Sequence, residues 1–467
     1  MSAENQNSNL VQRLAKLMVE NKELSQQLKK LQEEYNKLQE ENDRLNSKIE
    51  HLKQKGAGEA EGIEITPLLR FKMATVLFVD IQGFSKIHQE NNSHEIIDEL
   101  DSIFFEFDQI AHKYKIERIK TIGDTYMCAG GVPVKNITNP IDVVLAALEM
   151  RFQLFETEKK RRQNGSTIWE IRMGMHTGPV IATTMGKKKV SYNIKGDTVN
   201  IASRMQAASQ KGDINISVTT YELVREYFEC EYIGIMPVKY TGNIEMYKVL
   251  GLKKEFAADP DGIFPNQNFT IKYLLRQFSD LQEIILDKLE KELPPYLYYH
   301  NFKHTIDVIS QVELIGIGEG VNDNDLLLLK TAALFHDAGH TVGYDNHEFL
   351  GTQIAREILP QYKYTPEQID TICELIMATK LPPNPKNLLE KIMCDADLDY
   401  LGRSDFIPVS NTLFEELKAQ NKINDINEWN KIQVKFISNH QYFTETANRL
   451  REVNKQKQIE RIKKLIK

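Results

Sequence analysis

Two aspartates in the middle of the chain follow apolar stretches that have the composition of buried strands. Asp80 closes the run Ala74-Thr-Val-Leu-Phe-Val, and Asp124 follows Lys120-Thr-Ile-Gly. If the two stretches are neighbouring strands, these carboxylates can bridge two divalent cations, which would activate an attacking hydroxyl and neutralise a triphosphate leaving group. Taken alone, each aspartate is more often a residue that forms a turn.

A predicted helix over residues 198–209 carries Asn200 and Arg204 four positions apart. This spacing places both side chains on one face of the helix, where they can act on one substrate. The basic run at residues 187–189, which includes Lys188, either binds a triphosphate or is a solvated loop.

Histidines and aspartates gather in three short segments of the C-terminal half. The segments are Tyr299-His-Asn-Phe-Lys-His304, Phe335-His-Asp-Ala-Gly-His340 and Cys394-Asp-Ala-Asp-Leu-Asp399. We expect His300 and His304 to share a helix face, and the pair His336-Asp337 to lie within an apolar helix. A single histidine on an apolar face is usually a satisfied core residue. Three such clusters in one helical domain instead indicate a metal site.

The N-terminal region predicts a coiled coil. Leucines recur every seven residues from Leu10 to Leu52, and proline and glycine are absent until Gly56. A one-sided stripe of this length needs burial, so residues 1–55 predict a parallel homodimer, with a single solvated helix as the alternative. Asn21 and Asn42, in the other core register, favour pairing in register.

The remaining elements divide the chain further. Strands and helices alternate over residues 63–252, which predicts an α+β domain, and residues 253–266 have the composition of a linker. Residues 265–445 have helical patterning and no convincing strand. We expect residues 446–467 to form a basic helical tail that either binds an acidic or lipid surface or is solvated.

Composition excludes several classes of protein. The net charge of −7 argues against a dedicated nucleic-acid binder, and the four cysteines form no CxxC pair. No apolar run approaches the roughly 20 residues needed to span a bilayer, and no signal peptide is visible. These features predict a cytoplasmic protein without a transmembrane segment.

Residues 63–252 resemble the class III nucleotidyl cyclase catalytic domain. The matching segments, in family order, are Phe78-Val-Asp80-Ile-Gln-Gly-Phe84-Ser, Ile119-Lys-Thr-Ile-Gly-Asp124-Thr-Tyr-Met, Arg172-Met-Gly-Met-His-Thr-Gly178 and Gly196-Asp-Thr-Val-Asn200-Ile-Ala-Ser-Arg204-Met. The resemblance implies a ferredoxin-like palm fold, a dimer with active sites at the interface, and two Mg or Mn ions. The implied metal ligands are Asp80, Asp124 and the Ile81 carbonyl. Asn200 and Arg204 match the groups that orient the ribose and stabilise the pentavalent phosphate.

Two positions bear on the choice of purine. Lys120 matches the lysine of adenylyl cyclases, and lysine can only donate, which suits adenine N1. Asn193 departs from the family pattern, because adenylyl cyclases carry aspartate at this position. Its carbonyl can accept from adenine N6, and its amide NH₂ can instead donate to guanine O6. The resemblance therefore implies an adenylyl cyclase, with a guanylyl cyclase as the alternative. Thr241 stands where the family usually has a phosphate-binding lysine, for which Lys239 is a candidate substitute.

The third region resembles the HD metal-phosphohydrolase superfamily, in the arrangement of cyclic-nucleotide phosphodiesterases. The implied first-metal ligands are His304, His336, Asp337 and Asp397, with Asp337 bridging to a second divalent metal (Zn, Mg, Mn or Fe). His300 matches the general acid. His340 and His347 are candidates either for the second metal site or for groups that orient the hydroxide. Lys380 departs from the histidine or aspartate of relatives, and the purine-clamping glutamine of those enzymes is not located by sequence.

The sequence thus predicts a bifunctional enzyme that makes cyclic AMP from ATP and hydrolyses a phosphoester, most plausibly cyclic AMP to AMP. One alternative is a cyclase whose HD domain is a non-catalytic regulator that binds nucleotide or metal. Another is a scaffold with two decayed domains, against which the complete set of matched carboxylates and Arg204 argues.

Overall fold

The computed structural model describes residues 68–82, 93–162, 170–185, 191–238 and 242–466. The predicted coiled coil at residues 1–55 lies outside these ranges, as do Lys188, Lys239 and Thr241. Among the described residues, no helix combines the length and apolarity that crossing a bilayer requires.

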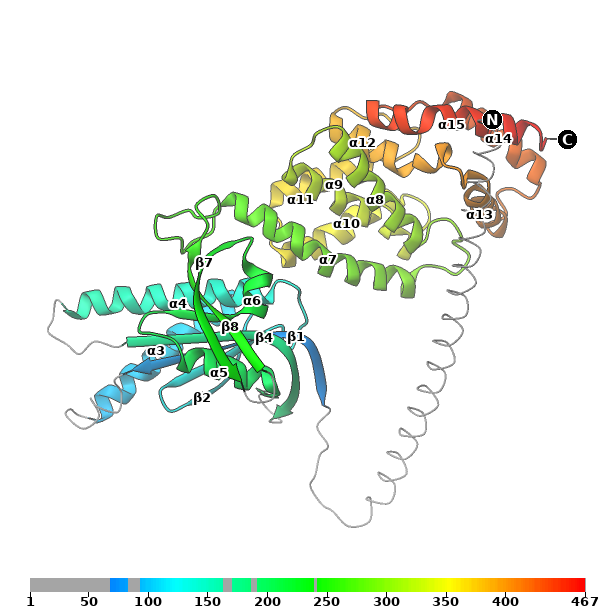
Figure 1. The fold of residues 1–467 in the computed structure, drawn as a ribbon. Helices are drawn as coiled ribbons and strands as arrows, with labels where there is room; N and C mark the ends of the chain where they lie inside the picture. Colours follow the sequence, from blue (N-terminus) through cyan, green and yellow to red (C-terminus); the bar gives the residue numbers. More distant parts are fainter. Residues whose placement is uncertain (1–67, 83–92, 163–169, 186–190, 239–241, 467) are drawn as a thin grey trace, which may run out of the picture. The chain divides into compact units, whose positions relative to one another are not determined.

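The first described region is an α+β domain built on one sheet (Figure 1). Its strands are β1 (Leu69–Gln82), β2 (Glu117–Ile122), β3 (Thr125–Gly130), β4 (Glu170–Met185), β5 (Ser191–Lys195), β6 (Ile214–Ser217), β7 (Phe228–Val238) and β8 (Gly242–Leu252). The strand order is β2-β3-β1-β4-β6-β8-β7, with β5 paired to β4. Only the β4–β6 pairing is parallel among the described strands.

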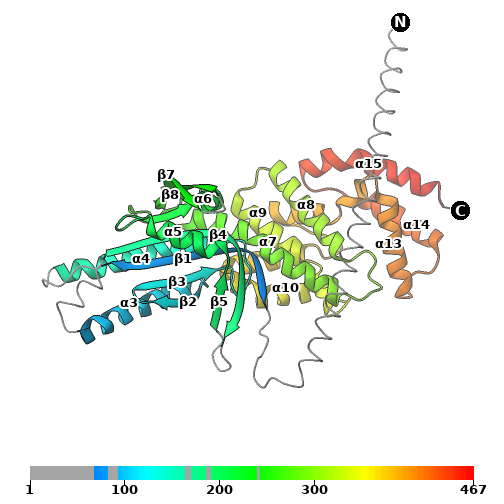
Figure 2. The same ribbon diagram turned by 60° about the horizontal axis from the view of Figure 1, so that its bottom comes forward.

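Helices cover both faces of this sheet because the strand residues alternate between two cores. Leu77, Val79 and Ile81 of β1 pack on the side of α3 (Ser93–Lys113) and α4 (Asn139–Arg162). Val76 and Phe78 join the opposite core, which includes Ala202 of α5 (Asp197–Ala207). Figure 2 shows α3 and α5 on opposite sides of the sheet. The short helix α6 (Val218–Val224) completes the domain.

The C-terminal region is helical. Its helices are α7 (Gln267–Glu292), α8 (Phe302–Gly318), α9 (Asp323–Phe335), α10 (His347–Ile358), α11 (Pro366–Ala378), α12 (Leu388–Asp397), α13 (Phe406–Ala419), α14 (Ile426–Asn439) and α15 (Glu445–Lys463), with short 3₁₀ turns η1 (Ala338–Thr341), η2 (Leu359–Tyr362) and η3 (Asp399–Gly402). Asparagine side chains cap the N-termini of α7, α8, α9 and α12, which fixes where these helices begin. The predicted α+β and all-helical regions are both confirmed.

Residues 253–266 differ from the linker expected from composition. Phe256 and Ile263 are buried, and the Asp259 carboxylate accepts hydrogen bonds from the backbone N–H groups of Ile263 and Phe264. The core that contains Phe256 continues to Phe269 of α7. This segment is therefore a packed connection, because its apolar side chains join two cores.

The expected basic tail at residues 446–467 also differs. Its helix, α15, buries Ile459 and Ile462 against Phe406. Lys455 is only 2% exposed; its ammonium group donates to the His440 carbonyl at 2.7 Å and pairs with Glu452 at 2.8 Å. The apolar and paired residues hold this helix in the C-terminal domain, so it is not a separate tail.

Candidate functional site

The structure brings the two predicted carboxylates of the sheet domain together. Asp80 pairs with Thr125 across β1 and β3, and Asp124 lies in the turn just before Thr125. The Thr125 hydroxyl donates to Asp80 Oδ1 at 3.0 Å, and the Ile81 N–H donates to the Asp124 carbonyl at 3.1 Å. Burial and the negative charge of Asp80 raise the pKa of Asp124. Two carboxylates that repel each other at a strand end are suited to bind divalent cations, which relieve that repulsion.

Asn200 and Arg204 are both exposed on α5. The helix is fixed from its other side, since Ile201 and Met205 are buried and the Thr198 hydroxyl donates to the Pro179 carbonyl at 2.7 Å. The predicted shared face is therefore present and open to a ligand. The role of the Ile81 carbonyl as a metal ligand stays a prediction.

The two residues expected to choose the purine lie on strands that approach each other. Lys120 is exposed on β2, and Asn193 is half-buried on β5. Asn193 pairs with Thr183 of β4, which folds β5 back along the sheet, and β2 and β5 are in contact. This arrangement is consistent with both side chains facing one base.

In the helical domain, four predicted ligands converge on one point. His304 Nε2 lies 3.1 Å from Asp397 Oδ1, 3.3 Å from His336 Nε2 and 3.5 Å from Asp337 Oδ2. The Asp337 Oδ2 atom is buried without a hydrogen-bond partner among the described residues. His336 Nδ1 contacts the Ala333 carbonyl at 2.8 Å, so Nδ1 carries the proton and Nε2 can accept a metal.

A second group of ligands shares Asp337. Its Oδ1 atom lies 3.5 Å from His347 Nε2 and 3.9 Å from His340 Nε2. Burial lowers the pKa of His340 to about 3, and neither of its ring nitrogens has a hydrogen-bond partner in the described part of the chain. A neutral, unpartnered imidazole is ready to bind a cation. His300 and His340 form one group of candidate ligands with Asp337, and His304 and His336 form another, so these side chains can hold divalent metal.

Two details of this site differ from the sequence prediction. His336 and Asp337 do not lie within an apolar helix, because α9 ends at Phe335 and the chain turns into η1. His300 and His304 do not share a helix face either. The Asn301 side chain accepts hydrogen bonds from the N–H groups of Lys303 and His304, so α8 begins after His300.

A glutamate that the sequence did not reveal holds His300 instead. The Glu416 carboxylate, from α13, accepts hydrogen bonds from the N–H groups of Tyr299 (2.9 Å) and His300 (3.1 Å) and from the His300 imidazole. Burial lowers the pKa of His300, but Glu416 together with Asp337 and Asp397 outweighs it, so the net shift is upward. The sequence does not single out Glu416 for this role, because the adjacent Glu415 lies in the same mixed polar and apolar helix.

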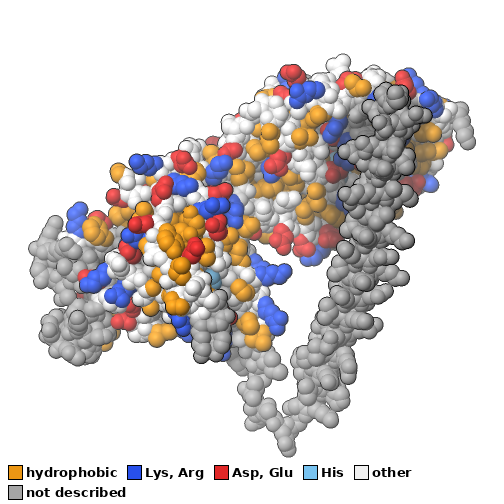
Figure 3. All heavy atoms as spheres, in the orientation of Figure 1, with side chains coloured by type: hydrophobic (Ala, Val, Ile, Leu, Met, Phe, Trp, Pro, Cys, Tyr) orange, Lys and Arg blue, Asp and Glu red, His pale blue; other side chains and the backbone are white. Residues whose placement is uncertain are grey.

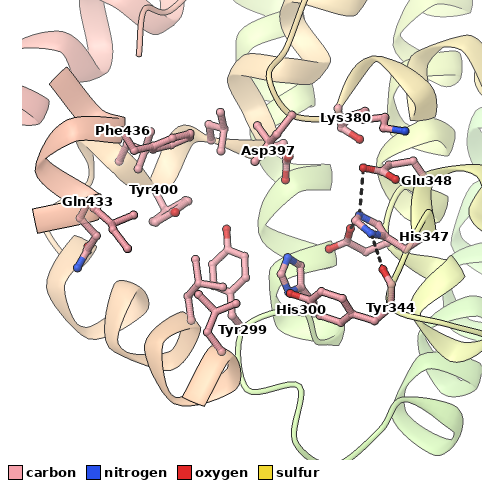
Figure 4. Close-up of a pocket in the computed structure, with 18 of the residues that line it drawn as sticks. Tyr299, His300, Tyr344, His347, Glu348, Lys380, Asp397, Tyr400, Gln433 and Phe436 are labelled. Carbon is pink, nitrogen blue, oxygen red and sulfur yellow. Dashed lines mark hydrogen bonds and ion pairs between the residues drawn. The ribbon is translucent and has the colours of Figure 1, made fainter. Parts of the chain in front are cut away.

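A cavity of about 500 Å³ opens beside these groups (Figure 4). Its walls carry Tyr299, Tyr400, Trp429, Gln433 and Phe436, and one end is lined by His300, Asp337 and Asp397. The sequence did not single out Gln433, which lines this cavity. Its Oε1 accepts from the Ser410 hydroxyl, and its Nε2 lies 3.4 Å from Asn430 Oδ1. Lys380 is exposed at the rim of the cavity.

Comparisons with known proteins match the two regions separately. Residues 67–251 match the model of the adenylate and guanylate cyclase catalytic domain, and residues 301–399 match that of the HD domain. The receptor-type guanylate cyclase gcy-8 of Caenorhabditis elegans is 36% identical over 192 residues, which are 40% of this chain and 17% of that protein. An adenylate cyclase of Mycobacterium bovis is 31% identical over 191 residues, 41% of this chain and 42% of that protein.

Among solved structures, the guanylate cyclase domain of RhGC from Catenaria anguillulae in complex with GTP is 30% identical. The match covers 40% of this chain and 100% of that one, with a TM-score of 0.36. The chain spans less than half the length of the curated relatives named above. Residues 67–251 therefore form a catalytic domain of the adenylate and guanylate cyclase family, and residues 301–399 form an HD domain in the same chain.

Proposed function

We propose that this chain makes cyclic AMP from ATP in its cyclase domain and hydrolyses cyclic AMP to AMP in its HD domain. The observation that carries the proposal is the shared carboxylate Asp337, which joins two ligand clusters at the end of a cavity large enough for a nucleotide. Its counterpart in the cyclase domain is the pair Asp80 and Asp124.

In the cyclase domain, Asp80 and Asp124 would hold two Mg or Mn ions. Bound there, the ions would activate the ribose 3′-hydroxyl and neutralise the leaving pyrophosphate. Asn200 would orient the ribose, and Arg204 would donate to the phosphoryl oxygens as negative charge develops on them. Both side chains can do so because they are exposed on one face of α5.

In the HD domain, the side chains around Asp337 would hold two divalent metals, which supply a hydroxide for attack on phosphorus. His300 would donate a proton to the departing ribose oxygen. Glu416 favours the protonated imidazole and fixes its orientation, since it accepts from both the ring and the backbone N–H of His300. Tyr299, Phe436 and Gln433 offer aromatic faces and an amide to a purine.

The preference for adenine rests on Lys120 and Asn193. Relatives of both kinds match the cyclase domain, so the purine must be chosen by side chains at the base. We expect ATP to exceed GTP in kcat/KM, and the double variant Lys120→Glu, Asn193→Cys to erode that preference. A lost hydrogen bond that leaves its partner unpaired costs about 1–3 kcal/mol. A wild-type preference for GTP would show instead that the chain is a guanylyl cyclase.

We also propose that the cyclase acts as a homodimer. Its candidate catalytic side chains lie on an open surface, and Tyr232, Ile233 and Ile235 of β7 are exposed. Figure 3 shows hydrophobic side chains gathered over the region of β7 and β8. Deleting residues 1–55 should lower cyclase activity at low protein concentration, and the activity should recover as the protein concentration rises. Specific activity of the truncated chain that does not vary with concentration would contradict this proposal.

Full-length protein loaded with Mn²⁺ and given cyclic AMP tests the HD assignment. We expect AMP as the product. If metal-loaded protein binds cyclic AMP but never forms AMP, the HD domain is a regulator instead of a hydrolase.

A further inference from the structure

A polar cluster, buried except for the exposed Lys363, joins the cyclase domain to the HD domain. It consists of Thr138 and Asp142 at the start of α4, Tyr273 of α7, and Lys363 directly after η2; we call it the interdomain joint. The Tyr273 hydroxyl lies 2.8 Å from Asp142 Oδ1, and the Thr138 hydroxyl donates to Asp142 Oδ2 at 2.9 Å. The Lys363 ammonium lies 3.4 Å from the Tyr273 hydroxyl, 4.0 Å from Asp142 Oδ1 and 4.6 Å from the centre of the tyrosine ring.

In the interdomain joint, the carboxylate of Asp142 in the cyclase domain is paired by side chains that lie outside that domain. Asp142 is only 3% exposed, and burial raises its pKa despite Lys363 and three hydrogen-bonding side chains. Lys363 and the Tyr273 hydroxyl, both outside the cyclase domain, supply the opposing charge and one of these hydrogen bonds. A buried polar group that loses its hydrogen-bond partner is destabilised, so the bond from Tyr273 to Asp142 resists a shift between the two domains.

Further contacts run across the joint in both directions. Lys115, which follows α3, donates to the Gln361 carbonyl of η2 at 2.9 Å, and the Ile137 N–H donates to Asp280 of α7 at 2.9 Å. Lys115 and Lys363 both have left-handed backbones, with φ of 56° and 64°. Residues that end a helix often adopt this backbone, so each lysine marks the end of the helical element that brings it to the joint.

On the HD side, one helix connects the joint to the metal site. Helix α10 begins with His347 and Glu348, which line the nucleotide-sized cavity, and it ends at Ile358. The 3₁₀ turn η2 follows without a break and leads directly to Lys363. A displacement of His347 on metal or ligand binding would therefore move the Gln361 carbonyl and Lys363 at the other end of the same rigid element.

On the cyclase side, hydrogen bonds connect the joint to the strand that carries Asp80. The Asn139 amide donates to the Asn136 carbonyl, and Asn136 in turn lies 3.2 Å from Asp142. The Thr75 hydroxyl of β1 donates to Asn139 Oδ1 at 2.7 Å, five residues before Asp80. Lys115 likewise precedes β2, which carries Lys120. Thr75 and Asn139 are fully buried, so this connection is shielded from water.

We propose that the interdomain joint couples the two sites, so that the state of the HD metal site sets the rate of the cyclase. This inference goes beyond the proposed function, on which its activity readout rests. Coupling between sites in proteins typically changes a property by 5-fold to 150-fold, and for binding it is reciprocal. The continuous chain of packed and hydrogen-bonded elements supplies a route for it, and only a measured coupling establishes that the route is used.

A double-mutant cycle on the full chain tests the coupling. Asp337→Asn perturbs the HD site, and Tyr273→Phe removes the hydroxyl at the joint while keeping the ring. Tyr364→Phe is the matched control, because Tyr364 is also buried and its hydroxyl contacts Thr331 at 2.8 Å, within the HD domain. Cyclase rate is followed as pyrophosphate release, which does not depend on whether cyclic AMP is later hydrolysed.

We expect Asp337→Asn to change pyrophosphate release at least fivefold in the wild-type and Tyr364→Phe backgrounds, and less than twofold in the Tyr273→Phe background. Equal changes in all three backgrounds, or no change in the wild type, would overturn the inference. A wild type that releases no pyrophosphate would defeat the proposed cyclase function instead. In that case the amide exchange rates of residues 69–82 in β1 are measured on the same variants. If Asp337→Asn changes these rates in the wild-type and Tyr364→Phe backgrounds but not in the Tyr273→Phe background, the coupling stands; equal changes in all three would overturn it.

Discussion

Replacing Gly174 by alanine should inactivate the cyclase, while the HD domain should retain its hydrolytic activity. Gly174 lies on β4 directly beneath α5, where an added Cβ would be 1.8 Å from the Gln206 nitrogen and 2.3 Å from the Met205 carbonyl carbon. Ordinary contacts between such atoms are about 3.5 Å, so α5 must move by roughly 1.5 Å. Both contacts are backbone atoms, which no change of rotamer can remove.

The helix that must move carries Asn200 and Arg204. A misplacement of about 1 Å in a catalytic group can cost roughly 100-fold in rate, so Gly174→Ala should lower the cyclase rate by at least about 100-fold. The overpacking itself should cost about 1–3 kcal/mol, which leaves a stable domain folded. The assay is the initial rate of pyrophosphate release at saturating ATP, with thermal unfolding measured on the same sample.

The HD domain offers the converse variant. A Cβ on Gly339 would lie 1.9 Å from the His347 carbonyl oxygen, so Gly339→Ala should push α10 away from η1 and separate the ligands His340 and His347. Hydrolysis of cyclic AMP should fall at least about 100-fold. Each variant should change the other domain's activity by at most about tenfold, through the interdomain joint.

A third glycine is the control for both variants. Gly343→Ala places a Cβ 3.4 Å from Leu350 Cδ1, the one heavy atom within 4 Å, and should preserve both activities. The reasoning would be refuted by a folded Gly174→Ala protein with wild-type cyclase activity. Loss of both activities in each variant would show that the cost is global unfolding instead of displacement of one helix.

Three further predictions concern the HD domain. Asp337→Asn should remove bound metal, measured by elemental analysis, and should make cyclic AMP accumulate from ATP where the wild type forms AMP. His300→Ala should leave metal content unchanged and slow hydrolysis by about 10²–10⁴-fold, as expected for loss of a general acid; equal loss of metal would mean that His300 is a ligand. Burial lowers the pKa of His440 to about 4. Below pH 6.5 the unfolded chain therefore binds a proton at His440 that the folded chain does not bind until about pH 4. The free energy of unfolding should fall as the pH drops from 6.5 to 4. Each pKa unit is 1.36 kcal/mol, so this single group contributes up to about 3 kcal/mol to that fall. In the His440→Phe variant, the urea midpoint of unfolding should vary less with pH over this range. An unchanged dependence of the midpoint on pH would assign the acid sensitivity to other groups.

The sequence predicted the ligands that stand in short contiguous segments. The structure brings Asp80 close to Asp124, and it gathers His336, Asp337 and Asp397 around His304, as expected for segments at strand ends and helix turns. Their roles as metal ligands stay a prediction. The sequence did not predict that His300 lies outside α8. Asn301 caps that helix, and such a cap was visible in the sequence as an asparagine before Phe302.

The contacts that the sequence did not predict are those formed by packing between distant segments. Glu416 reaches His300 across 116 positions, and Gln433 enters the cavity only because α14 packs beside α13. Two partners of Asp142, Tyr273 and Lys363, come from another domain, so its full set of contacts cannot be read from the polar residues beside it in the sequence. Helix α15 looked like a solvated basic tail because composition does not show that Lys455 is buried.

A time course with the purified chain, ATP and Mg²⁺ or Mn²⁺ separates the bifunctional enzyme from its alternatives when pyrophosphate, cyclic AMP and AMP are all measured. We predict immediate release of pyrophosphate, a transient rise of cyclic AMP, and AMP that appears after a lag. The Asp80→Asn variant should form none of these from ATP and should still convert added cyclic AMP to AMP. Cyclic AMP that accumulates without any AMP, from protein with a loaded HD site, would contradict the bifunctional account.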